Sequence, residues 1–191
     1  INANFREEIF NVSKVVVNIQ NDVKKILQIM DDNSHENYKD AIIMFIKDLK
    51  VKTALNLIQK FEDKYNSNPS TFSSDLVGEI FLLKGYCQKI QFNFTESYKS
   101  FINAYNSNKV NINIIREACF SYYRIKNNKY KELMTILFEK DQFDPIYWTI
   151  EFIESNNKER FIEQDEFVIL SKNRTFVNAC FLEILTNNEY D

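Results

Sequence analysis

The chain has 191 residues, a usual size for one domain, and can bury roughly 70% of the surface that its unfolded form exposes. With 45% hydrophobic and 27% charged residues, its composition excludes a disordered chain. The formal net charge is −3 and acids and bases are interleaved, which argues against a nucleic-acid-binding surface. Two local basic concentrations, at 24–25 and 47–52, lie beside Asp residues, so we interpret them as solvated helix faces.

Glycine and proline are rare in this sequence. There are two Gly and two Pro residues, where average usage would give roughly thirteen and ten. This scarcity disfavours β-turns and glycine-rich loops, and it favours helices joined by polar links. We therefore expect an all-α fold.

The first expected helix runs from about Asn4 to Met30 and carries apolar residues in alternating steps of four and three. These positions are Phe5, Ile9, Val12, Val16, Ile19, Val23, Ile26 and Met30. Val15 and Val17 widen the apolar face beyond what a two-stranded coiled coil needs. Two interpretations stay open: the helix packs along the rest of the domain, or it assembles with helices of other chains as a homo- or hetero-oligomer.

A polar linker at 31–37 separates this helix from the body of the chain, so we expect residues 1–37 and 38–191 as two parts of one domain. The body is predicted to consist of paired helices joined by short links. Their ranges are 38–49, 51–65, 73–90, 93–106, 111–126, 128–140, 145–156, 159–171 and 174–187. Pro69 and Pro145 each lie where a helix begins or just before it.

The best internal match to a known repeat lies at 78–110 and resembles a tetratricopeptide repeat. The matching positions are Phe81, Gly85, Phe94, Ser97, Phe101 and Ala104. A weaker copy begins near Ile114, with an offset of about 36 residues, close to the family period of ~34. Small residues let helices approach, and we expect Phe94, Phe101 and Tyr105 to fill the core.

The resemblance implies a right-handed superhelix of antiparallel helical hairpins. The long first helix and the helices after Glu159 would then cap the two ends of the stack. Such a protein binds a peptide or a helix of a partner, as an interaction scaffold or a subunit of a larger complex.

The residues that carry chemistry in enzymes are sparse. Cys87, Cys119 and Cys180 form no CxxC pair, and we expect buried reduced thiols in an intracellular protein, cytoplasmic or nuclear. The single histidine, His35, lies in the polar linker without a partner at metal-ligand spacing. Nucleotide-binding and hydrolase motifs are absent, and no apolar run is long enough for a membrane span. We therefore predict a protein that is not an enzyme and has no metal or cofactor.

The candidate partner-binding residues lie on the first helix of each hairpin, outside the expected core. They are Lys84, Gln88, Arg116, Tyr123 and Lys126. Family members that clamp a terminal carboxylate carry lysine and asparagine where this chain has Leu82 and Tyr86, so an apolar or aromatic groove is the better expectation. Two alternatives remain: a structural subunit that self-assembles through its first helix, and a domain that senses a signal peptide.

Overall fold

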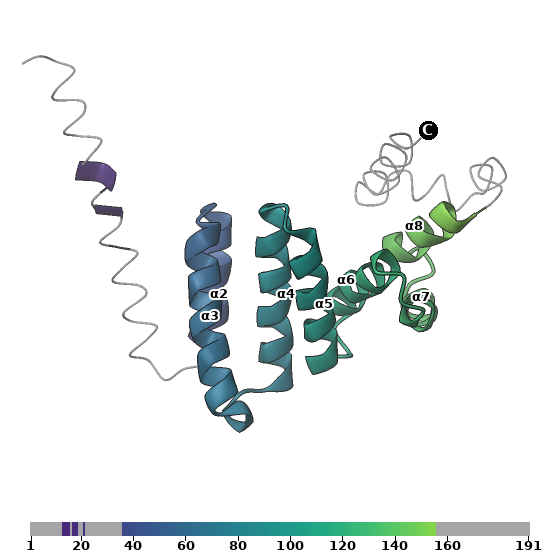
Figure 1. The fold of residues 1–191 in the computed structure, drawn as a ribbon, viewed down its shortest axis with the longest axis horizontal. Coiled ribbons are helices and arrows are strands. Elements are labelled where there is room, and N and C mark those ends of the chain that lie inside the picture. The colour runs from purple at the N-terminus through teal and green to yellow at the C-terminus, as the bar shows by residue number, and fades with distance from the viewer. Residues whose placement is uncertain (1–12, 16, 19–20, 22–35, 156–191) are drawn as a thin grey trace, which may run out of the picture. The chain divides into compact units, whose positions relative to one another are not determined.

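Helices account for the regular structure of the residues that the structure describes, as the scarcity of Gly and Pro predicts. The computed structural model describes residues 13–15, 17–18, 21 and 36–155, and Figure 1 draws its helices as ribbons. Between residues 36 and 155 it contains seven α-helices, one short 3-10 helix and no strand. The expected all-α class is thus confirmed for this part of the chain.

The observed helices follow the predicted ranges closely. Their bounds are α2 Glu36–Lys47, α3 Val51–Ser67, η1 Pro69–Thr71, α4 Ser74–Ile90, α5 Phe94–Ser107, α6 Ile112–Arg124, α7 Lys129–Lys140 and α8 Pro145–Glu154. Every helix end lies within two residues of its predicted position. The short polar links between the helices leave few alternatives for their boundaries, and Asn111 and Asp144 cap α6 and α8 through their side chains.

Residues 1–76 and 77–191 form two separate units of packing. In the first unit, α2 and α3 pack around the buried ring of Phe61, whose centroid lies 5.8 Å from that of Tyr38 and 4.9 Å from that of Phe72. Edge-to-face geometry is the favoured arrangement for such aromatic pairs. Phe72 follows η1, so the Pro69 turn returns the chain onto this aromatic core.

In the second unit, α4 and α5 form an antiparallel pair. A Cβ atom on Gly78 would lie 2.6 Å from Asn108 Cβ, whereas Gly85 faces the ring of Phe101. Near the end of α4, Gln88 Oε1 accepts a hydrogen bond of 2.7 Å from Ser100 Oγ. Residue numbers therefore rise along α4 as they fall along α5, which establishes the antiparallel order.

The next pair, α6 and α7, has the same arrangement. Cys119 Sγ lies 3.6 Å from the Tyr130 carbonyl oxygen near one end of the pair. Towards the other end, Lys140 Nζ donates to the Val110 carbonyl oxygen at 3.3 Å. Fully buried apolar side chains fill the space within and around this pair. They include Ile114, Ile115, Ala118, Leu133 and Leu137.

Three helix-to-helix turns share one backbone geometry. Leu49, Phe92 and Lys126 have φ angles of 59°, 60° and 57°, in the left-handed region that glycine usually occupies. At each turn this residue donates its backbone N–H to the carbonyl three residues back, and the next residue donates to the carbonyl five back. This is the Schellman motif, and its second and third copies lie 34 residues apart, at Phe92 and Lys126.

Two predictions at these turns were wrong. Lys126 was placed on a helix of 111–126, but α6 ends at Arg124 and Lys126 lies in the turn. Phe94 was expected in the core, yet it is 46% exposed and contacts Phe92, which is 80% exposed. Phe94 is the first residue of α5, directly after the left-handed turn at Phe92. Phe101 and Tyr105, further along α5, are buried as predicted.

Several predictions fall on parts of the chain outside the described residues. The helices at 159–171 and 174–187 belong here, as do Cys180, His35 and the first-helix positions Phe5, Ile9, Val12, Val16, Ile19 and Val23. The described residues between 13 and 21 are helical, and Val15 and Val17 are 55% and 52% exposed. The division expected at residue 37 stays a prediction.

Candidate functional site

The helices α4 and α6 are joined through polar side chains at their outer faces. Tyr86 on α4 hydrogen bonds through its hydroxyl to Glu117 on α6, and Lys89 Nζ lies 3.6 Å from Glu117 Oε2. Burial and the negative charge of Glu117 raise the pKa of Tyr86 well above its usual range. The Tyr86 hydroxyl therefore keeps its proton and remains a donor to Glu117 at neutral pH.

Aromatic side chains continue from this contact along α6. Phe120 and Tyr123 follow Glu117 at steps of three, which places all three residues on one face of the helix. The Phe120 and Tyr123 ring centroids lie 6.3 Å apart, and Tyr123 meets Tyr130 of α7 edge-on at 5.4 Å. Tyr86, Phe120 and Tyr123 are half-buried and pack on the hydrophobic core beneath them. We call these three residues the aromatic face.

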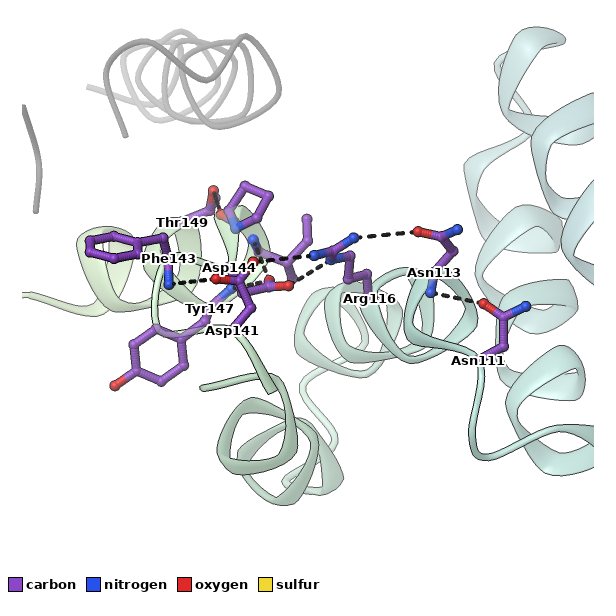
Figure 2. Close-up of polar contacts among 10 residues, drawn as sticks. Asn111, Asn113, Arg116, Asp141, Phe143, Asp144, Tyr147 and Thr149 are labelled. Carbon is purple, nitrogen blue, oxygen red and sulfur yellow. Dashed lines mark hydrogen bonds and ion pairs between the residues drawn. The ribbon is translucent and has the colours of Figure 1, made fainter. Parts of the chain in front are cut away.

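A buried ion pair joins α6 to the start of α8 (Figure 2). Arg116 Nε lies 2.6 Å from Asp144 Oδ2, and the Asp144 side chain is fully buried. Asp144 also caps α8, because its Oδ1 accepts hydrogen bonds from the backbone N–H groups of Ile146 and Tyr147. Arg116 Nη2 also lies 3.7 Å from Asp141 Oδ2, so the guanidinium group forms ion pairs with two aspartates of its own chain.

The five predicted partner-binding residues do not form one cluster. Gln88 faces α5 through its bond with Ser100, and Arg116 faces α8 through Asp144. Lys84 is half-buried on α4, and Lys126 lies in the turn after α6. Tyr123 alone belongs to the aromatic face, and a partner-binding role for any of the five stays a prediction.

Sequence reasoning missed Tyr86 and Phe120 as members of this face. The spacing of Glu117, Phe120 and Tyr123 was available in the sequence, but it did not show that Tyr86 of α4 lies beside Glu117. The observed Tyr86 to Glu117 contact supplies that relationship. At one of the two carboxylate-clamp positions, Leu82 is 9% exposed and belongs to the core.

A basic turn was also missed. Arg124 ends α6, Lys126 lies in the α6–α7 connection, and Lys129 and Lys131 lie in the first turn of α7. No acidic residue occurs from 118 to 131. Lys129 Nζ stands 5.2 Å from the ring centroid of Tyr105 and 5.4 Å from that of Tyr122, a double cation–π contact. We call these four residues the basic turn.

The two cysteines that the structure describes are not activated, and the described residues contain no cluster of metal ligands. Burial raises the pKa of the Cys87 thiol to about 11, and burial with the charge of Asp144 raises that of Cys119 to about 12. Both thiols are free, as predicted, and stay protonated at neutral pH, whereas a nucleophilic cysteine needs a lowered pKa. Within residues 13–155 as described, no group of three His, Cys, Asp or Glu side chains could hold a metal ion.

Comparisons with protein-family models, with curated proteins and with solved structures found no match to this chain. Among the helices that the structure describes, none is long and apolar enough to cross a membrane.

Proposed function

We propose that this chain is a non-catalytic protein-interaction module, a scaffold or complex subunit that binds an apolar helix or peptide of a partner. In this proposal the paired helices form a tetratricopeptide-like right-handed superhelix. The first helices of its hairpins present the binding surface, and the segments at the two ends of the chain cap the stack.

Repetition within residues 77–155 supports the repeat part of the proposal. The left-handed turn residues Phe92 and Lys126 are 34 residues apart, as are Gly85 and Cys119, each buried at the interface of its own helix pair. That spacing equals the usual tetratricopeptide period of about 34 residues. Such repeats stack because a single hairpin cannot bury its apolar surface alone.

The observation that carries the binding proposal is the aromatic face of Tyr86, Phe120 and Tyr123. Rigid aromatic side chains are enriched at the energetic centres of interfaces, because they bury a large area at a small cost in conformational entropy. The neighbouring charges already pair within the fold, Lys89 with Glu117 and Arg116 with Asp144. A partner therefore gains most from apolar contact, and its binding should depend weakly on salt.

A library of helical peptides displayed on phage tests the proposal. We expect the protein to select peptides with apolar residues spaced at three and four, and to bind a synthetic copy with a Kd in the micromolar range. Replacing Phe120 and Tyr123 together by serine should weaken that Kd at least about tenfold. Serine at Phe92 and Phe94 removes two aromatic rings elsewhere and should leave it unchanged. Equal loss in both double variants, or selection of no peptide, contradicts the proposal.

The exposed side chains of Val15 and Val17 favour a second candidate function, self-assembly through the first helix. A contiguous apolar face on a helix marks a surface that another helix can cover, and these two valines lie beside the apolar positions of the expected first helix. Light scattering on the full chain and on a version beginning at Tyr38 separates the two candidates. A full chain that is dimeric or larger, with a folded monomeric short version, favours assembly. A monomeric full chain removes this candidate.

A further inference from the structure

The basic turn is an exception in a chain whose net charge is −3. Its four cationic residues occupy a stretch of eight, from Arg124 to Lys131, and the nearest acidic residue in sequence is Glu132. Lys126 and Lys131 are exposed, and between the cations Ile125 is 49% exposed. This surface therefore offers positive charge together with an apolar side chain, which suits an acidic and partly apolar segment.

The structure brings the end of α8 to this turn. Tyr130, between Lys129 and Lys131, donates a hydrogen bond of 2.5 Å from its hydroxyl to Glu154 Oε1. Glu154 is the last residue of α8, so the chain leaves the described structure beside the basic turn. Each residue extends a chain by at most about 3.5 Å, so Glu159, four residues beyond Ser155, lies within about 14 Å of Ser155.

The segment at residues 159–167 is acidic and partly apolar, which complements the charge and the exposed Ile125 side chain of the basic turn. Residues 159–167 contain four acidic residues and one basic residue, which gives a net charge of 1 − 4 = −3. The acidic residues are Glu159, Glu163, Asp165 and Glu166. Phe161, Ile162 and Phe167 supply apolar side chains among them. A short tether to Ser155 gives this segment a high effective concentration at the turn, of the order of millimolar.

We propose that residues 159–167 dock on the basic turn of their own chain. Carboxylates of the segment pair with Lys126, Lys129 and Lys131, and its apolar side chains cover Ile125. The basic turn adjoins the aromatic face, because the Tyr123 ring meets that of Tyr130 at 5.4 Å. The proposal does not rest on the peptide-binding function, and charge reversal at Lys126 and Lys131 leaves Tyr86, Phe120 and Tyr123 unchanged.

Hydrogen exchange on the full chain tests the docking. At low salt we expect the amides of 159–167 to exchange about tenfold faster in the double variant Lys126→Glu/Lys131→Glu than in the unaltered protein. Lys47→Glu/Lys52→Glu reverses the same amount of charge on α2 and α3 and should leave those amides unchanged. Adding Glu163→Lys/Glu166→Lys to the first variant should restore protection. Amide exchange rates in α4 to α7 that equal those of the unaltered protein would verify that each variant is folded.

Equal exchange of the 159–167 amides in all variants overturns the proposal.

A different molecule bound at the basic turn would give a different result. A dimer, detected by light scattering, that Lys126→Glu/Lys131→Glu converts to a monomer would place the segment on a second copy and overturn docking within one chain. With the four acidic residues changed to Gln, we expect a synthetic peptide of residues 156–170 to bind the exposed turn. Binding instead to phosphatidylserine vesicles or to oligouridine, but not to the peptide, also overturns it.

Discussion

Arg116 of α6 and Asp144 of α8 form an ion pair whose Nε to Oδ2 distance is 2.6 Å. The Asp144 carboxylate is fully buried, and its other oxygen accepts two backbone N–H groups of the first turn of α8. One carboxylate thus caps α8 and joins it to α6. A buried charge is tolerated only when it is paired and hydrogen bonded, so the position of α8 depends on Arg116.

Removing the guanidinium group should destabilise the fold markedly. Arg116→Ala leaves the Asp144 carboxylate buried without its cation, and we expect the free energy of unfolding to fall by about 3 kcal/mol. Lys99→Ala is the matched control, because the Lys99 to Glu96 pair is exposed on α5 and should contribute less than about 1 kcal/mol. Urea denaturation measures both. A loss below about 1 kcal/mol for Arg116→Ala would show that Asp144 gains a substitute partner.

The helices were predictable from the sequence because they depend on local patterns. Pro145 after Asp144, for example, marks the start of α8, and the small residue at Gly85 predicted a close approach to another helix. The side-chain partners were not predictable, since Arg116 and Asp144 are 28 residues apart and nothing in their surroundings links them. Phe94 shows the same limit, because an aromatic residue at a helix start is equally compatible with a buried or an exposed position.

The left-handed turns were also beyond sequence reasoning. Schellman motifs are normally recognised by glycine at the left-handed position, and this chain has Leu49, Phe92 and Lys126 there. With glycine nearly absent, the usual marker of a helix end was lost. The end of α6 was accordingly predicted two residues too late, at residue 126.

Two serines on α5 should respond differently to replacement by alanine. Ser97 is fully buried, and its hydroxyl has no hydrogen-bond partner among the described residues, so Ser97→Ala should stabilise the protein by about 1 kcal/mol. Ser100 donates to Gln88 Oε1, and Ser100→Ala removes that bond. We expect the Ser100→Ala variant to be at least about 1 kcal/mol less stable than the Ser97→Ala variant. Thermal and urea unfolding of the two variants measure this difference, and equal stability would contradict the assignment.

Gly85 is required because α5 approaches α4 closely. A Cβ atom on Gly85 would lie 2.5 Å from Phe101 Cδ1 and 2.8 Å from Cζ, and the Phe101 ring is buried, with 1% of its surface exposed. Gly85→Ala gains about 1 kcal/mol of helix propensity, but we expect the overpacking to leave it about 2 kcal/mol less stable.

A double-mutant cycle with Phe101 tests the cause. Phe101→Leu shortens the side chain that the new methyl group meets, so Gly85→Ala should be less costly in that background than in the unaltered protein. Urea denaturation of the four proteins in the cycle gives the coupling energy. An identical cost in both backgrounds would show that the loss arises elsewhere than at the Gly85 to Phe101 contact.

The two buried thiols should make the protein less stable at alkaline pH. The pKa of a thiol in the unfolded chain is about 8.5, whereas burial raises those of Cys87 and Cys119 to about 11 and 12. Above pH 8.5 the unfolded chain therefore releases protons that the folded chain keeps. The contribution of these two thiols to the free energy of unfolding is fully present below pH 8.5, and it is lost as the pH rises towards 11 and 12. Each thiol contributes a slope of up to about 1.4 kcal/mol per pH unit.

Urea denaturation between pH 8 and 10 measures this slope, and the variant Cys87→Ala/Cys119→Ala should show a shallower one. Cys180 should be changed to Ser in every protein, so that the two buried thiols are the only ones that titrate. In the same background, a disulfide reagent at pH 8 should label Cys87 and Cys119 only at the rate at which the fold opens, because reaction needs an exposed thiolate. Rapid labelling of the folded protein, or an unchanged slope in the double variant, would mean that the thiols are accessible in solution.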